Sequence, residues 1–288
     1  MTHCGVSGWT HPDWSGVVYP ALKPRGFHPL EHLAQTLDFV EIDCSFDRPI
    51  RPELTKLWLR KTPETFRFTV QVGRPFTTEG VLCPADLEAF KEGLWPLLHS
   101  GRLGCLLLRF PWSFRFSKEN REQLIEVRKA FHEFPMVAEL RHSSWSLDEA
   151  IGTLMDYRVG FCNVDQPEDG RAMPPRSYAT SDVGYVRLFG REGEPWFAEE
   201  KSRDYLYKPP ELGLWKARID RMSSYTKDIY VSFANATAGK AVVNALQMRA
   251  LVTDPTAVPK RRSDRTTLEM PRRSPGAPIV RTALRQLA

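Results

Sequence analysis

The sequence lacks any long hydrophobic run. No apolar segment approaches the roughly 20 residues that a membrane-spanning helix needs, and the mean hydropathy is -0.38. Residues 1–9 contain neither the basic stretch nor the apolar stretch of a secretory signal peptide. These absences predict a cytoplasmic protein that does not contact a membrane.

Cysteine is also scarce, and its five copies show no paired spacing. An odd number without a Cys-x-x-Cys element argues against a disulfide framework and against a zinc site. Four of the five lie in apolar segments with strand character, which favours buried free thiols in a reducing compartment. The five residues are Cys4, Cys44, Cys83, Cys105 and Cys162.

The net charge of +5 is confined to one end of the chain. Residues 254–288 hold eight basic and three acidic residues, which leaves 32 of each in residues 1–253. This end is rich in Pro, Arg, Ser and Thr without helical or strand periodicity, so it is predicted to be a disordered tail beside a domain at 1–253. Its charge could attract nucleic acid. The alternative is a solvated terminus without a partner.

Short apolar segments alternate with longer amphipathic segments in the body. The apolar segments predict eight strands, at 4–8, 39–44, 66–72, 105–110, 137–141, 160–164, 185–189 and 229–233. The amphipathic segments predict helices at 28–37, 52–61, 84–99, 118–134, 147–157, 211–225 and 238–252. This alternation implies parallel strands, and eight of them favour an α/β single-domain (β/α)8 TIM barrel. A doubly wound sheet is the alternative, but no glycine-rich phosphate loop follows a strand.

Local signals mark the ends of several of these elements. Ser117 and Ser146 each precede a segment with acidic residues in its first turn, the pattern of a helix N-cap. The long irregular segments 165–181 and 191–210 follow predicted strands. Both are therefore expected to lie over the carboxyl-end face, where barrel enzymes bind their substrates.

Charged and amide side chains interrupt the apolar strands or follow them directly. Burial of an unpaired charge costs several kcal/mol, so charges at such positions need partners or a ligand. If the strands are parallel, these side chains gather at one end of the barrel. They are Glu41 and Asp43, Arg109, Glu139 and Arg141, Asn163 and Asp165, Arg187, and Asn235. Either they form an internal ion-pair network that braces the barrel, or the arginines bind an anionic ligand.

A metal or nucleophile site has less support. Glu41, Glu139, Asp165 and His142 could ligate a metal, but of the seven histidines only His142, apart from the N-terminal one, directly follows a strand. Neighbouring arginines would repel a cation, so no metal and no cofactor are predicted. No Gly-x-Ser-x-Gly element is present.

Several short motifs occur in a recognisable order. They are Gly5-Val6-Ser7-Gly8-Trp9, Val40-Glu41-Ile42-Asp43-Cys44-Ser45-Phe46, Leu106-Leu107-Leu108-Arg109-Phe110-Pro111, Glu139-Leu140-Arg141-His142-Ser143-Ser144-Trp145, Tyr185-Val186-Arg187-Leu188-Phe189-Gly190 and Tyr230-Val231-Ser232-Phe233-Ala234-Asn235. In this set the chain resembles the YecE-like family (domain of unknown function 72) over most of residues 3–252. The resemblance implies a TIM barrel related to the xylose isomerase-like group, without a settled activity. Enzymes of that group use metals held by histidine and acidic ligands, and the YecE-like pattern lacks that histidine set.

The chain also departs from the family pattern, mostly at strand ends. The family usually has Tyr where Asp47 stands, Lys at Gln71, Gln at Arg109, His at Phe189 and Asn at Ala234. The changes at Gln71 and Phe189 remove two possible proton carriers. The resemblance therefore implies a diverged member, with an altered ligand or without catalysis.

The first functional hypothesis is a metal-independent hydrolase or isomerase that acts on a small anionic substrate. Glu139 would be the general acid or base, oriented by Arg141, while Arg109 and Arg187 would bind the anion. The supporting residues would be Glu41 and Asp165 as second acid/base or bracing groups, Trp9 and Trp145 as walls, and His142 and Asn235 as further ligand contacts. For the tryptophans, the alternative is that they cap the barrel end as hydrophobic side chains.

Two other hypotheses remain open at this point. A nucleic-acid-binding protein would take a phosphate or an extruded nucleotide at the same arginines, with the tail 254–288 adding nonspecific attraction. A non-catalytic sensor would keep the ligand site and lose the chemistry. The sequence predicts no oligomeric state.

Overall fold

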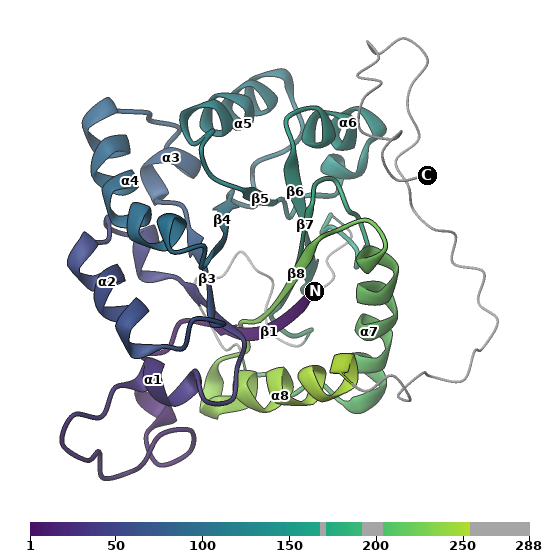
Figure 1. Cartoon of the computed structure of the whole chain (residues 1–288). Helices are drawn as coiled ribbons and strands as arrows, with labels where there is room; N and C mark the ends of the chain where they lie inside the picture. The colour runs from purple at the N-terminus through teal and green to yellow at the C-terminus, as the bar shows by residue number, and fades with distance from the viewer. Residues whose placement is uncertain (168–170, 192–203, 254–288) are drawn as a thin grey trace.

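The computed structural model describes residues 1–167, 171–191 and 204–253, which form a closed barrel of eight parallel strands. The strands follow one another around the barrel in chain order, and β1 closes it by pairing with β8. Figure 1 shows the strands at the centre with the helices as a ring around them. The predicted (β/α)8 TIM barrel is confirmed. The predicted tail, 254–288, lies outside the described residues.

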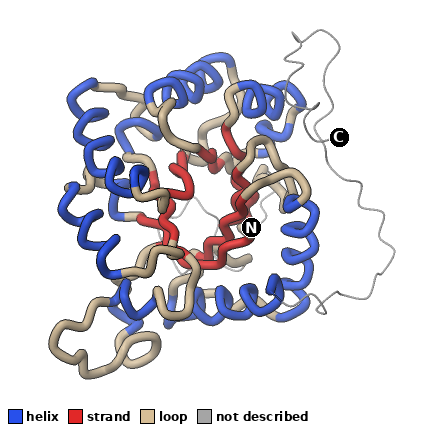
Figure 2. Tube along the Cα trace, viewed as in Figure 1, coloured by secondary structure: helices blue, strands red, loops and turns tan. Residues whose placement is uncertain are grey.

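Helices and strands alternate along the chain, and Figure 2 shows each class in its own colour. The strands are β1 (Thr2–Ser7), β2 (Phe39–Ile42), β3 (Arg67–Gln71), β4 (Leu103–Arg109), β5 (Met136–Glu139), β6 (Val159–Asp165), β7 (Val183–Leu188) and β8 (Asp228–Phe233). The α-helices of the described residues are α1 (Pro29–Leu33), α2 (Pro52–Lys61), α3 (Arg74–Thr77), α4 (Pro84–His99), α5 (Lys118–Ala130), α6 (Asp148–Asp156), α7 (Pro209–Ser223) and α8 (Lys240–Thr253). Short 3₁₀ helices lie at η1 (Pro12–Trp14), η2 (Cys44–Phe46), η3 (Ser143–Ser146) and η4 (Thr237–Gly239). Among these helices, none is both long and apolar enough to cross a membrane.

The predicted elements are all present, and the differences lie at their ends. Helices α2 and α4 have the predicted bounds, with proline in the first turn of each. The short helix α3 was not predicted, because four residues are too few to show a helical period. Ser117 caps α5 as predicted, since its hydroxyl accepts a hydrogen bond from the Asn120 backbone N–H at 3.2 Å. The predicted cap at Ser146 is wrong: its hydroxyl donates to the Ser143 carbonyl within η3, and α6 begins at Asp148.

Side chains alternate between the two faces of each strand. One set packs against the surrounding helices, and the other fills the barrel interior with residues such as Phe39, Leu107 and Tyr185. All five cysteines are free thiols, and three of them are buried. Cys44 differs from the prediction: it is exposed, because β2 ends at Ile42 and the chain turns into η2.

Replacement of Gly93 with alanine is expected to destabilise the barrel by about 2 kcal/mol, because the added methyl group would overpack the site. Gly93 lies on the buried face of α4, where an added Cβ would be 2.0 Å from the Ile50 carbonyl oxygen. The matched control is Gly152→Ala in α6, where a Cβ would contact nothing within 4 Å. Alanine is a better helix former than glycine, so the control should gain about 1 kcal/mol. Urea denaturation measures the free energy of unfolding of both variants. Equal changes in the two variants would contradict the close approach of Gly93 to the Ile50 carbonyl.

Candidate functional site

Glu41 is a fully buried carboxylate whose two oxygens accept hydrogen bonds from five side chains of four other strands. The pairing of β1 with β2 sets Ser7 opposite Glu41. The donors are Ser7 (2.8 Å), Gln71, Tyr185 (2.8 Å), Ser232 (2.9 Å) and Arg187, which donates twice, from Nη2 (2.7 Å) and Nε (3.1 Å). No lone pair is left over for a ligand, so Glu41 braces the barrel interior.

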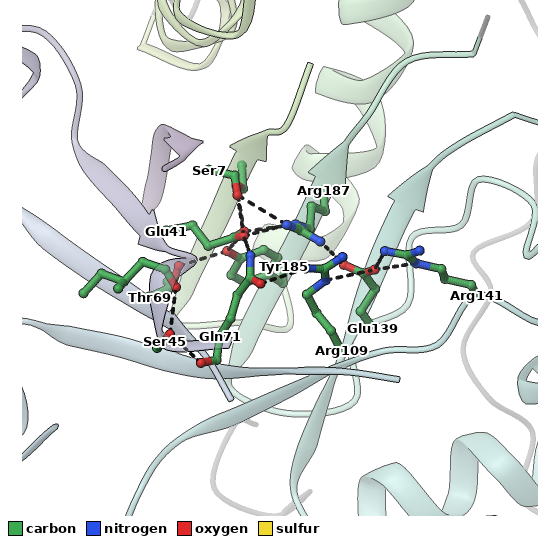
Figure 3. A network of polar contacts seen from close by, with 12 residues as sticks. Ser7, Glu41, Ser45, Thr69, Gln71, Arg109, Glu139, Arg141, Tyr185 and Arg187 are labelled. Carbon is green, nitrogen blue, oxygen red and sulfur yellow. Dashed lines mark hydrogen bonds and ion pairs between the residues drawn. The ribbon is translucent and has the colours of Figure 1, made fainter. Parts of the chain in front are cut away.

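Arg187 lies at the centre of the network and links two carboxylates. Its Nη1 donates to Glu139 Oε2 at 2.6 Å, while the rest of its guanidinium binds Glu41. Arg141 Nε donates to the other oxygen of Glu139 at 2.6 Å. Figure 3 shows these side chains as one continuous row of alternating charge from Glu41 to Arg141. The sequence predicted that charged side chains of distant strands gather at one end of the barrel, and the structure brings Glu41, Arg187, Glu139 and Arg141 together.

The arginines hold both carboxylates in the ionised form. Burial raises the pKa of Glu139, but Arg141, Arg187 and Arg109 outweigh it, so its pKa lies well below the ordinary value. Burial likewise raises the pKa of Glu41, and Arg187 with the hydrogen-bond donors reverses the direction. Both side chains are therefore charged in the folded protein at neutral pH.

Arg109 is the least compensated cation of this network. Its Nη1 donates to Gln71 Oε1 at 2.8 Å, but its buried Nε has no hydrogen-bond acceptor within the described part of the chain. The nearest oxygen of Glu139 is 3.9 Å from Nε, which is too far for a hydrogen bond. Burial and the neighbouring Arg187 lower the pKa of Arg109 to about 9. Gln71 and Arg109, two positions where the resemblance implies a departure from the family pattern, contact each other.

Five partly exposed residues, which we call the rim, end or follow β2, β4 and β5 at the carboxyl end of the barrel. They are Asp43, Phe46, Arg109, Arg141 and His142. The Arg109 side chain is 20% exposed and the Arg141 side chain 10% exposed, whereas Arg187 and Glu139 have no exposed area. The Arg109 guanidinium lies 5.2 Å from the centre of the Phe46 ring, in cation–π contact. Two guanidinium groups of the network are therefore partly exposed at this end.

Asp165 and Asn235 lie outside the network, although the sequence placed them with it. Asp165 points toward the helices and binds Arg191 (3.0 Å) and the Trp215 indole N–H (2.8 Å). Asn235 donates to the Tyr205 carbonyl at 2.7 Å and to the Asn244 side chain at 2.9 Å. These contacts fix α7, α8 and the segment after residue 204 to the barrel.

The two tryptophans predicted as walls are packed into the core. Trp9 is 7% exposed and lies edge-on to Trp58 of α2, with ring centres 5.1 Å apart. Trp145 is fully buried, stacks on Phe114, and donates its indole N–H to the Phe114 carbonyl at 2.7 Å. This packing fits the alternative of hydrophobic caps.

His142 lies at the rim, where its side chain caps the short helix η3. Its Nδ1 accepts from the Ser144 backbone N–H at 3.2 Å, which caps η3. Within the described ranges, no group of three or more His, Cys, Asp or Glu side chains could hold a metal ion.

Sequence reasoning missed part of the site. Ser7, Gln71, Tyr185 and Ser232 complete the shell around Glu41 but were not predicted as site residues. The available signal was alternation, because Tyr185 shares a face with Arg187 as residues two apart in one strand. Phe46 gave no such signal, since it lies in the short 3₁₀ helix η2 and not in a strand.

Three comparisons place the chain among known proteins. UPF0759 protein YunF from Bacillus subtilis (strain 168) is 29% identical over 272 residues, which cover 88% of this chain and 95% of that protein. A DUF72 family protein from Thermotoga maritima MSB8 is 32% identical, with a TM-score of 0.78, over 88% of this chain and 100% of that chain. A DUF72 family protein from Enterococcus faecalis V583 is 25% identical, with a TM-score of 0.75, over 88% and 98% of the two chains.

The family model described as "Protein of unknown function DUF72" matches residues 3–268. This match runs beyond the predicted domain end at residue 253 into the predicted tail. It agrees with the resemblance seen in the motifs, and the barrel agrees with the fold of the related structures. The chain therefore belongs to the DUF72 family.

Proposed function

We propose that the barrel binds a small anionic ligand, with a phosphate or carboxylate group, at the rim between Arg109 and Arg141. The observation that supports this most is the incomplete pairing of Arg109. A guanidinium that is largely buried without a full set of acceptors is costly, and an anion would supply the missing acceptors. The planar fork of arginine also suits the oxygens of phosphate and carboxylate groups.

The arrangement favours a bracing role for Glu139 over the acid/base role predicted from the sequence. A general base works best when its pKa lies near the working pH. Arg141 and Arg187 keep the pKa of Glu139 far below that range, and both of its oxygens already accept hydrogen bonds. Glu139 therefore positions the arginines, and Arg187 in turn is held by two carboxylates rather than by a ligand.

Substitution of Arg109 with glutamine tests the proposal directly. The full chain is titrated with inorganic sulfate and with inorganic phosphate, and binding is followed by calorimetry. The dissociation constant of Arg109→Gln should be at least about tenfold larger than that of the wild type. Without anion, the variant should be as stable as the wild type, because the lost cation was poorly compensated.

Arg115 provides the matched control, since it is exposed in the loop after β4. Arg115→Gln should bind both anions like the wild type. Equal binding by Arg109→Gln and Arg115→Gln would show that the anion binds elsewhere, through charge alone. No binding to the wild type would contradict the proposal itself.

A further inference from the structure

Asp43 is a rim carboxyl that has no arginine partner in the described chain. It follows β2, two residues after Glu41, and the charge of Glu41 acts on its carboxyl group. Glu41 and Glu139 are fully buried and paired with Arg187, whereas Asp43 is partly exposed.

The backbone at Gly8 makes room for Asp43. Gly8 has φ +70°, and an added Cβ would lie 2.5 Å from Asp43 Oδ2 and 3.1 Å from His11 Nε2. The imidazole and the carboxyl group therefore lie against the same short piece of backbone. His11 Nε2 is itself 3.1 Å from the Ser7 carbonyl oxygen, so Asp43 is not its hydrogen-bond partner at that nitrogen.

Asp43 and Arg109 both contact Phe46, Asp43 through the backbone and Arg109 through the ring. The Asp43 backbone carbonyl accepts a hydrogen bond from the Phe46 N–H at 3.0 Å at the start of η2, and Arg109 lies over the Phe46 ring. An anion held by Arg109 would lie near this turn. An ionised Asp43 would repel the anion, whereas a neutral carboxylic acid could donate a hydrogen bond to it.

We propose that Asp43 takes up a proton when the anionic ligand binds at the rim and donates that proton in a hydrogen bond to a ligand oxygen. This inference rests on the proposed anion site and names Asp43 as the acidic group that donates a hydrogen bond to the ligand there. It selects anions that present an acceptor oxygen beside the charged group, such as a phosphate ester or a hydroxy acid. The proton comes from solvent and returns to it when the ligand leaves.

The surroundings of Asp43 support this assignment. Burial raises the pKa of Asp43 above its ordinary value, and the charge of Glu41 raises it further. His11 and Arg187 act in the opposite direction without reversing the shift. A carboxyl group with this environment gains a proton more readily than the arginine-paired Glu41 and Glu139, whose pKa values are lowered.

Calorimetric titration with inorganic sulfate tests the inference, because sulfate itself stays fully ionised between pH 5 and 8. Binding to the wild type at pH 6, measured in two buffers of different ionisation enthalpy, should show uptake of a proton. The affinity should fall as pH rises, by up to about tenfold per pH unit. Asp43→Asn, a neutral isostere, should show no proton uptake, a flat pH profile, and at pH 8 an affinity at least equal to that of the wild type.

Three control variants identify the titrating group. Asp47→Asn changes an exposed carboxylate of the same turn region and should keep the wild-type profile. His11→Gln and His142→Gln should also keep it; if either abolishes proton uptake, the proton belongs to a histidine and the inference is wrong. Proton uptake that persists in Asp43→Asn would likewise overturn it while leaving the anion site intact. Failure of sulfate to bind in an Arg109-dependent way would overturn both.

Discussion

Replacement of Arg187 with methionine is expected to lower the free energy of unfolding by about 4 kcal/mol or more. The substitution keeps much of the volume but leaves two ionised carboxylates without their shared cation. Removal of one partner from a buried ion pair costs about 3–5 kcal/mol, because the remaining charge stays desolvated. Arg187 has no exposed area and bonds to both Glu41 and Glu139, so the full cost applies.

Urea denaturation at pH 7 measures this loss of stability. A second variant tests whether the loss comes from a carboxylate that is left without its cation. The double variant Arg187→Met, Glu41→Gln removes the carboxylate that is left without a cation, while Glu139 keeps Arg141, and it should recover part of the stability. The matched control is Arg74→Met, which breaks an exposed pair with Asp47 and should change stability by less than about 1 kcal/mol. A loss in Arg187→Met no larger than in Arg74→Met would contradict the bracing role.

The sequence predicted the buried network because charge is rare inside apolar strands. Glu41, Arg109, Glu139, Arg141 and Arg187 each interrupt or end an apolar run, and all five meet in the barrel. Once eight alternating strands implied a closed parallel barrel, the inward positions two residues apart brought these charges together.

The positions of Asp165 and Asn235 could not be read in the same way. Strands of a parallel barrel are buried on both faces, so their sequences are apolar at nearly every position. In β6, residues Phe161 and Cys162 face opposite sides and are both buried, which hides the side that Asp165 takes. Only the packing of Trp215 from α7, distant in sequence, shows that this carboxylate faces the helices.

The rim depends on contacts that no local pattern encodes. Phe46 ends η2, the short helix after β2, and its approach to Arg109 at the end of β4 depends on how this segment folds back over the barrel end. Phe189, where the resemblance implies another departure from the family pattern, lies with its ring centre 4.6 Å from the Arg187 guanidinium and 5.4 Å from that of Arg141. Phe46 and Phe189 therefore pack against guanidinium groups of the network. The sequence alone did not indicate either contact.

Stability should fall steeply when the pH drops below about 4.5, the ordinary pKa of a glutamate. The folded protein holds Glu41 and Glu139 with lowered pKa values, so folding favours their ionised forms. Their contribution is complete above pH 4.5, where the unfolded chain is also ionised. It is lost as pH decreases further, by up to about 1.4 kcal/mol per pH unit for each group.

Glu139→Gln separates this effect from general acid denaturation. At pH 7 the variant should be less stable than the wild type by about 3 kcal/mol, because an amide cannot neutralise Arg141 and Arg187. Since the wild type loses this advantage as Glu139 is protonated, the gap between the two stability curves should narrow by up to about 2 kcal/mol between pH 4.5 and 3. The control Glu79→Gln changes an exposed carboxylate, so its curve should run parallel to that of the wild type. A constant gap between Glu139→Gln and the wild type from pH 7 to 3 would show that Glu139 is not held ionised by the arginines.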